Sequence, residues 1–175
     1  MRQTEEELEY LDAVATSLGL CADEADIEEV REELYTQGFI KKRRARAKQQ
    51  NKISKPLVFV SVDGYEIYVG KNNRQNDELT LKFAESKDIW FHTKNIPGSH
   101  VIVRTKGTTP PGATLNEAAN LAAYYSKARN GSQVPVDYTE RRNVKKPSGA
   151  KPGMVIYENY KTAYVNAVEA PQANP

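Results

Sequence analysis

Alternating hydrophobic and polar positions predict a β-hairpin near the middle of the chain. Two runs of strand-forming residues, Asp88–Thr93 and Ser99–Arg104, flank a short loop that contains Pro97 and Gly98. A Pro-Gly pair between two such runs is typical of a hairpin connection, because proline fixes one backbone angle and glycine tolerates the turn. We therefore expect these strands to form the central hairpin of the folded unit.

The two faces of the first of these strands differ in character. Since successive side chains of a strand point to opposite faces, Ile89 and Phe91 share one face, which we interpret as core. Asp88, Trp90 and His92 share the other face. Trp90 is the only tryptophan of the chain. It either fills the core between sheet and helix or offers a stacking platform to an RNA base, and the sequence leaves both interpretations open.

Helical spacing of hydrophobic residues predicts a helical hairpin before the sheet. One helix runs from Thr4 to Gly19 and the next from Asp26 to about Gly38, and each begins with a capping-box pattern. The hydrophobic stripe is narrow and the outer faces are acidic, as is typical of the end of a coiled-coil arm. The chain therefore resembles a piece of a longer protein.

The remaining pattern predicts an α+β fold with a largely antiparallel sheet built from hairpins, helices packed on one face and the other face free to bind. The first expected elements are strands 57–62 and 65–69, joined by a type I′ turn at Asp63-Gly64, and a short helix capped by Asn76 that leads to the central hairpin. After that hairpin we expect a helix from a Thr114–Glu117 capping box to about Arg129. A strand 134–139 follows, which Pro135 places at an edge or at its start, and a last hairpin pairs 154–158 with 162–165.

These patterns divide the chain into four parts. We expect an acidic helical hairpin over residues 1–40, a basic linker over 41–56, the α+β domain over 57–168 and a disordered tail over 169–175. No hydrophobic run approaches the ~20 residues of a membrane span, and the acidic start does not read as a signal peptide. Cys21 is the only cysteine, so no internal disulfide can form. A cytoplasmic location is the default.

The net charge of +2 hides an uneven distribution. Acidic residues dominate up to residue 36, and a dense basic run follows from Lys41 to Lys55. That run is equally consistent with a solvated linker and with a strap that contacts phosphates. In a second basic run, Arg141–Lys151, cations alternate with glycine and proline, which lets the backbone approach a ligand closely. Polyanions are the expected partners.

The sequence offers little support for an enzyme. Asp88 and His92 lie about 13 Å apart along one strand, too far for a direct acid-base pair. The chain has no nucleophile elbow, no His-Glu-x-x-His motif and no Walker A loop. A metal site would need His92 and His100 to meet across the hairpin, and the sequence does not fix that register. We expect no catalytic residue, no cofactor and no metal ion.

Several ordered motifs resemble those of one known family. Asp88–His92 is similar to its Asp-x-Trp-Leu-His signature, with Phe91 where leucine is usual, and Pro97–Val101 is similar to its Pro-Gly-Ser-His-Val turn. Val144–Pro147 and Gly149–Gly153 resemble its basic loop. Together, over about residues 57–165, these motifs resemble the NFACT-R domain of the bacterial fibronectin-binding protein A/RqcH family, relatives of eukaryotic NEMF. The acidic hairpin resembles the returning end of that family's coiled-coil arm.

The resemblance implies a tRNA- and rRNA-binding module of a ribosome-associated quality-control factor. Such factors bind large ribosomal subunits that hold an obstructed nascent chain, and they support alanyl-tRNA recruitment for C-terminal tailing of that chain. The family's N-terminal domain and helix-hairpin-helix region find no counterpart in the motifs above. In streptococci and their relatives the resemblance also implies a cell-surface adhesin that binds fibronectin without a signal peptide. The sequence does not indicate an oligomeric state.

Two hypotheses about partners follow. In the first, the chain contacts RNA, and in the second it is a fibronectin-binding fragment that offers an edge strand such as Val134–Tyr138 for strand addition. For the first hypothesis we expect the following residues to contact nucleic acid: Asp88, Trp90, His92, His100, Arg104, Arg141, Arg142, Lys145, Lys146 and Lys151.

Overall fold

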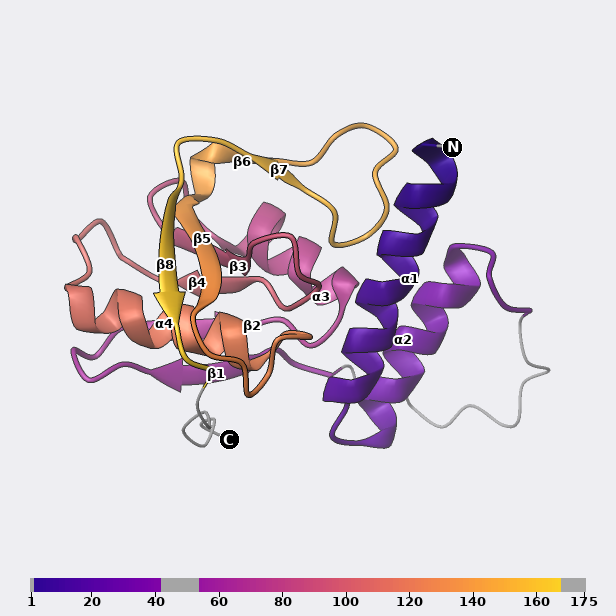
Figure 1. Ribbon diagram of the computed structural model, residues 1–175, viewed down its shortest axis with the longest axis horizontal. Coiled ribbons are helices and arrows are strands. Elements are labelled where there is room, and N and C mark those ends of the chain that lie inside the picture. Colours follow the sequence, from indigo (N-terminus) through magenta and orange to yellow (C-terminus); the bar gives the residue numbers. More distant parts are fainter. Residues whose placement is uncertain (1, 42–53, 168–175) are drawn as a thin grey trace.

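The computed structural model describes residues 2–41 and 54–167, which form a helical hairpin and an α+β domain (Figure 1). The basic segment 42–53 and the expected tail lie outside the described residues. The elements are α1 (Arg2–Leu20), α2 (Glu24–Thr36), β1 (Leu57–Val60), β2 (Glu66–Val69), α3 (Asn73–Asp77), the π-helix η1 (Glu78–Phe83), β3 (Ile89–Thr93), β4 (Val101–Val103), α4 (Gly112–Tyr124), β5 (Val134–Glu140), the 3-10 helix η2 (Arg141–Asn143), β6 (Val144–Lys145), β7 (Ile156–Tyr157) and β8 (Lys161–Val165).

A six-stranded antiparallel sheet forms the centre of the domain. Its strand order is β1-β2-β4-β3-β5-β8, and β6 and β7 form a separate two-stranded pair. The predicted α+β fold class is confirmed, and so is the position of the β3–β4 hairpin in the middle of the sheet.

Helix α4 covers one face of this sheet. Phe91, Val101 and Val103 from the central hairpin are completely buried against the small side chains of the helix, such as Ala118 and Ala122. Alanine at these positions lets the helix backbone approach the sheet closely. The prediction that Ile89 and Phe91 face the core is therefore confirmed.

The opposite face of the sheet is also covered, so the expectation of a free binding face is wrong. Trp90 and Ile102 are completely buried on this face. Leu79 of η1 and Val144 of β6 pack against them and complete a second core cluster. The sequence pattern did not show this cover, because both segments are short and the pattern does not tell on which face of the sheet they pack.

Two predicted capping boxes have a different role in the structure. Thr114 lies inside α4, where its hydroxyl donates a hydrogen bond to Asp63 Oδ2 at 2.7 Å, and Glu117 accepts one from the backbone N–H of Val62 at 3.1 Å. Both residues therefore bind the β1–β2 turn. That turn is not type I′, since only Gly64 has a positive φ, at 82°. Likewise, Thr4 lies inside α1.

The short helix before the central hairpin begins earlier than expected. Asn72 caps α3 by accepting a hydrogen bond from Gln75 N at 2.9 Å. Asn76, the predicted cap, instead accepts one from His100 N at 3.0 Å and so ties α3 to the strand end. Gly70 makes this contact possible, because a Cβ at that position would lie 2.2 Å from Asn76 Oδ1.

The last strands pair differently from the prediction. Strand β7 pairs with β6, whereas β8 pairs with β5, so the expected hairpin of 154–158 with 162–165 is wrong. Strand β5 lies between β3 and β8 and is not an edge. Pro135 is accommodated near the start of β5, the second of the two predicted positions. Helix α4 ends at Tyr124 instead of Arg129.

The helical hairpin packs against the α+β domain. Tyr10, Val14 and Val30 form a small buried cluster, to which Met154 of the loop after β6 adds a side chain from the domain. Figure 1 shows this loop reaching from the β6–β7 pair toward α1. Asp23, not Asp26, caps α2, since its side chain accepts a hydrogen bond from the backbone N–H of Asp26.

Candidate nucleic-acid interface

Asp88 is a buried structural carboxylate in this arrangement. It is 1% exposed, and it accepts hydrogen bonds from the backbone N–H groups of Glu85 at 2.8 Å and Thr105 at 2.9 Å. It also forms an ion pair with Arg104, whose Nη1 lies 3.0 Å from Asp88 Oδ2. These contacts hold the segment before β3 to the segment after β4. No surface of Asp88 is left for an RNA ligand.

Trp90 belongs to the core, which answers the question that the sequence left open. Its side chain is completely buried, and its ring lies 5.9 Å from that of His92, 5.3 Å from that of His100 and 4.8 Å from that of Tyr157. The indole Nε1 makes no hydrogen bond with the described residues. A stacked base cannot reach this ring in the folded domain.

The register of the central hairpin brings the two histidines together. Because Trp90 pairs with Ile102, His92 and His100 lie opposite each other, with ring centroids 5.4 Å apart. Burial lowers the pKa of His92 from 6.5 to about 4, and it lowers the pKa of His100 well below 6.5. His100 Nδ1 is hydrogen-bonded to Thr80 Oγ1 at 2.8 Å. Both imidazoles are therefore neutral at pH 7 and contribute no positive charge to an RNA surface.

Two of the predicted arginines stabilise the end of the π-helix η1. Arg141 donates hydrogen bonds to the carbonyls of Thr80 at 2.7 Å and Leu81 at 3.1 Å. Arg104 donates one to the carbonyl of Phe83 at 2.9 Å, and its guanidinium lies 4.7 Å from the centre of the Phe83 ring. The last carbonyls of a helix have no partner within it, so these arginines satisfy groups that would otherwise need water.

Two of the three predicted lysines of the basic loop hold that loop in place. Lys146 Nζ lies 2.9 Å from Asp77 Oδ2 and donates a hydrogen bond to the carbonyl of Lys151 at 2.7 Å. Lys151 Nζ lies over the rings of Tyr10 and Phe39, at 5.6 and 5.3 Å from their centres. Both are half-buried, and Lys151 joins the domain to the helical hairpin.

Only two of the predicted cations are well exposed. Arg142, whose side chain is 61% exposed, forms an ion pair with Glu140 at 2.5 Å. Lys145, at 65%, lies 3.6 Å from the equally exposed Glu158. Ion pairs between such exposed groups contribute little to stability, so both cations can exchange their partners for phosphates.

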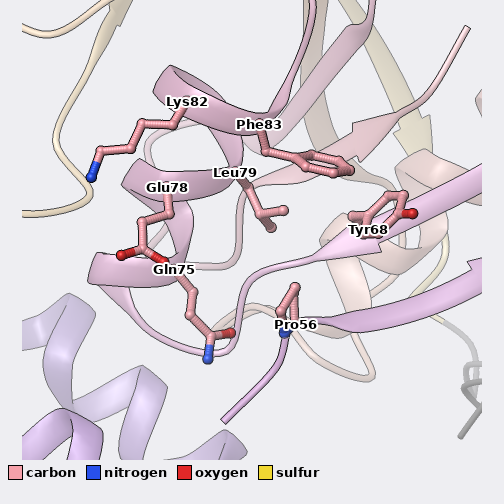
Figure 2. A pocket seen from close by; sticks show the side chains of 7 residues that line it. All are labelled: Pro56, Tyr68, Gln75, Glu78, Leu79, Lys82 and Phe83. Atoms are coloured by element: carbon pink, nitrogen blue, oxygen red, sulfur yellow. The ribbon is translucent and has the colours of Figure 1, made fainter. Parts of the chain in front are cut away.

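A pocket of about 380 Å³ lies where η1 meets β2 (Figure 2). Tyr68 and Phe83 form one side of it, with ring centroids 4.6 Å apart. Leu79 lies between these rings and the side chains of Gln75 and Glu78. Phe83 is 42% exposed, an unusual degree for a phenylalanine. Unpaired bases of single-stranded RNA stack on accessible aromatic side chains of this kind.

One cation lines this pocket and a second lies close to it. Lys82 is one of the lining residues and has no ion-pair partner among the described residues. The guanidinium of Arg104 lies 4.7 Å from the centre of the Phe83 ring. Pro56, which lines the pocket, directly follows the basic run Lys41–Lys55 in the sequence. Glu78 is the only acidic residue that lines this pocket. Sequence reasoning missed this site, because Tyr68 and Phe83 come from separate elements and follow no motif.

The sequence also gave no sign that acids of α2 are buried against the domain. Glu33 is 1% exposed, and its Oε1 accepts hydrogen bonds from Tyr10 at 2.8 Å and Asn73 at 3.0 Å. Asp26, equally buried, forms an ion pair with Lys71 at 2.5 Å. Burial alone would raise the pKa of Asp26, but hydrogen bonds from Lys71 and a serine outweigh it and lower the pKa. For Glu33 burial prevails and raises the pKa.

The Glu33→Ala variant is expected to lower the free energy of unfolding by about 2 kcal/mol, because it leaves the buried Tyr10 hydroxyl and Asn73 amide without an acceptor. Urea unfolding followed by circular dichroism measures the change. Glu32→Ala is the matched control, since Glu32 is exposed on the same helix. Equal unfolding curves for the two variants would contradict the role of Glu33 in this interface.

The described residues hold neither a metal-ligand cluster nor a membrane-spanning helix. No group of three or more histidine, cysteine, aspartate or glutamate side chains within 2–41 and 54–167 is placed to hold a metal ion. In the same ranges, none of the helices combines the length and the hydrophobicity that crossing a bilayer requires.

Comparison with known proteins relates the chain to two family models. The model described as the NFACT protein RNA binding domain matches residues 55–159. The model described as the NFACT N-terminal and middle domains matches residues 1–53, so the helical hairpin and the basic segment do have a counterpart in that region of the family.

Relatives that align with nearly the whole chain share almost half of their aligned residues with it. The Rqc2 homolog RqcH of Bacillus subtilis is 46% identical over 167 residues, which are 94% of this chain and 29% of the relative. The Rqc2 homolog RqcH of Streptococcus suis is 44% identical over 170 residues, 97% of this chain and 30% of the relative. The chain thus spans less than a third of the length of these relatives.

A solved structure has the same fold. The C-terminal part of the fibronectin/fibrinogen-binding protein of Streptococcus suis is 45% identical and superposes with a TM-score of 0.87, covering 96% of this chain and 66% of that one. With a family model that matches more than half of its length and with these relatives, the chain belongs to the NFACT family and contains the family's RNA-binding domain.

Proposed function

We propose that the chain is an RNA-binding module of an NFACT protein that acts in ribosome-associated quality control. Membership of the family and the similarity to RqcH proteins support this role. The observation that carries the proposal is the aromatic pair of the partly buried Tyr68 and the exposed Phe83, which borders a pocket that Lys82 also lines.

In the proposed mode of binding, an unpaired base stacks in the pocket of Figure 2 while cations hold its phosphates. Tyr68 and Phe83 supply the aromatic surface, and Leu79 forms an apolar floor. Lys82 and Lys55, both exposed, neutralise the RNA backbone next to the pocket. Base stacking on aromatic side chains and phosphate neutralisation by lysine are the two main contributions to single-strand binding.

In the whole protein, this module would contact rRNA or tRNA on an obstructed large ribosomal subunit and so support alanyl-tRNA recruitment for C-terminal tailing. We place this work in the cytoplasm and assign no catalytic step to the chain. Fibronectin capture through strand addition to β5 is not part of the proposal, because β5 is paired on both sides.

The Phe83→Ala variant is expected to bind a short single-stranded RNA about tenfold more weakly than the unchanged chain, because a stacked base contributes about 1–3 kcal/mol. Fluorescence anisotropy with labelled RNA measures the affinity across a salt series. Tyr164→Ala is the control, since Tyr164 is an aromatic residue of β8 that is 65% exposed and lines neither this pocket nor the one described below.

The salt series tests the proposal as a whole. For single strands, the logarithm of the affinity should fall with the logarithm of the salt concentration by about 0.7 for each phosphate neutralised. Affinity that does not change with salt would overturn the proposal. Equal affinities of the Phe83→Ala and Tyr164→Ala variants would place RNA away from the Tyr68–Phe83 pocket.

A further inference from the structure

A second pocket, of about 620 Å³, lies at one end of the sheet. It is bounded by the start of β3, the loop before α4 and the first turns of that helix, the end of β5 with η2, and the turn that leads into β8. It shares no lining residue with the pocket between η1 and β2. Its volume falls within the roughly 300–1,000 Å³ of small-molecule sites in proteins.

The inner wall of this second pocket is hydrophobic and well supported. Ile89, Leu115 and Tyr138 line it, and all three pack against the main core cluster. The ring of Tyr138 is stacked on Phe91, with centroids 5.3 Å apart and planes at 16°. A nucleobase has a flat hydrophobic face that matches such a wall.

The rim of the pocket is polar, with two cations, two amides and the carboxylate of Glu140. Lys161 is exposed, and its ammonium group has no hydrogen-bond or ion-pair partner among the described residues. Arg142 forms its ion pair with Glu140 through Nε, so its two terminal nitrogens can still donate hydrogen bonds. Asn143 donates a hydrogen bond to a threonine and retains its side-chain oxygen, and the side chain of Asn159 has no partner in the described part of the chain. The cations of the rim can therefore bind a phosphate, and its amides can form hydrogen bonds with the edge of a base.

We propose that this second pocket holds one unpaired nucleotide of the bound RNA, with its base against the Tyr138 wall, its base edge at Asn143 and Asn159, and its phosphate at Lys161 and Arg142. This inference rests on the proposed RNA-binding function. It adds a site that the aromatic pocket between η1 and β2 does not supply, so that two separate nucleotides of one strand are held.

Two variants of the whole chain test the site without touching the core. Lys161→Ala removes the unpartnered cation, and we expect affinity for a short single-stranded RNA to fall about fivefold and the salt slope to fall by about 0.7. Thr109→Trp fills the mouth of the pocket, because Thr109 is an exposed lining residue. We expect this variant to weaken binding by about tenfold, through loss of the stacked base.

Each variant has a matched control. Lys127→Ala also removes one exposed positive charge, but at the other end of α4, and Thr109→Ala changes the same position without filling the pocket. Both controls should bind RNA like the unchanged chain. In a heteronuclear NMR titration with adenosine monophosphate, we expect the amide signals of Asn143, Asn159 and Lys161 to shift.

The outcomes separate this inference from the proposed function. If the chain binds RNA with the expected salt dependence but Lys161→Ala and Thr109→Trp bind like their controls, the second pocket is not a nucleotide site and the proposed function stands. If no RNA binds at low salt, both proposals fail. Adenosine monophosphate that shifts only signals of the η1–β2 pocket would also overturn the inference.

Discussion

Replacing Trp90 with alanine is expected to lower the free energy of unfolding of the α+β domain by about 3–5 kcal/mol. The side chain is completely buried between the central hairpin, η1 and β6, so its removal leaves a cavity that Leu79 and Val144 cannot fill without moving. Urea unfolding followed by far-ultraviolet circular dichroism measures the loss. Fluorescence is unsuitable, since Trp90 is the only tryptophan.

Tyr164→Ala serves as the control for this experiment, because it removes an aromatic side chain that is 65% exposed. Its free energy of unfolding should change by less than about 1 kcal/mol. A Trp90→Ala variant as stable as this control would contradict the placement of Trp90 in the core. The milder Trp90→Phe variant separates packing from recognition: RNA affinity should stay within about twofold of that of the unchanged chain, whereas a direct stacking role would lower it about tenfold.

Acidification from pH 6.5 toward pH 4 is expected to destabilise the domain. The folded chain holds His92 with a pKa of about 4 and His100 with a pKa well below 6.5, whereas both have ordinary values after unfolding. In this range the unfolded chain binds more protons than the folded one, so the free energy of unfolding falls as pH falls. For His92 alone, the gap between 6.5 and about 4 corresponds to a loss on the order of 3 kcal/mol.

The His92→Phe variant isolates this contribution. Phenylalanine retains a ring beside Trp90 but cannot be protonated. The slope of the free energy of unfolding against pH should therefore decrease by the equivalent of up to one bound proton. Asp137, which favours the protonated form of His92, remains in both proteins. Glu33 acts in the opposite direction, because its raised pKa makes acid stabilising, and it is also common to both. Thermal unfolding at a series of pH values measures the difference, and identical pH profiles would refute the burial of a neutral His92.

Local patterns in the sequence were sufficient for much of the fold. The alternation in 88–104 predicted the central hairpin, and the periodicity before Gly19 predicted α1. Contacts between segments far apart in the chain could not be read in this way. Thr114 and Glu117 have the spacing of a capping box. Their hydroxyl and carboxylate groups instead form hydrogen bonds with a turn that lies about fifty positions earlier in the sequence.

The candidate site was harder to predict than the fold, for a physical reason. A positive charge in the sequence does not tell whether it will meet a phosphate or a partner within the protein. Arg104 and Arg141 are used to satisfy carbonyls of η1, and Lys146 is used by Asp77. The aromatic pair Tyr68–Phe83 was not predicted, because its two rings meet only once β2 and η1 are packed together.

The interface between α2 and the domain consists largely of side chains that need one specific partner. The carboxylate of Glu29 accepts hydrogen bonds from the amides of Asn72 at 2.7 Å and Gln75 at 2.9 Å, and Glu33 depends in the same way on Asn73. Hydrophobic contacts tolerate exchange of one residue for another of similar size, but a buried acid without its donor is costly. These positions are therefore expected to evolve as pairs, so that covariation between α2 and α3 across relatives would record the packing of the helical hairpin against the domain.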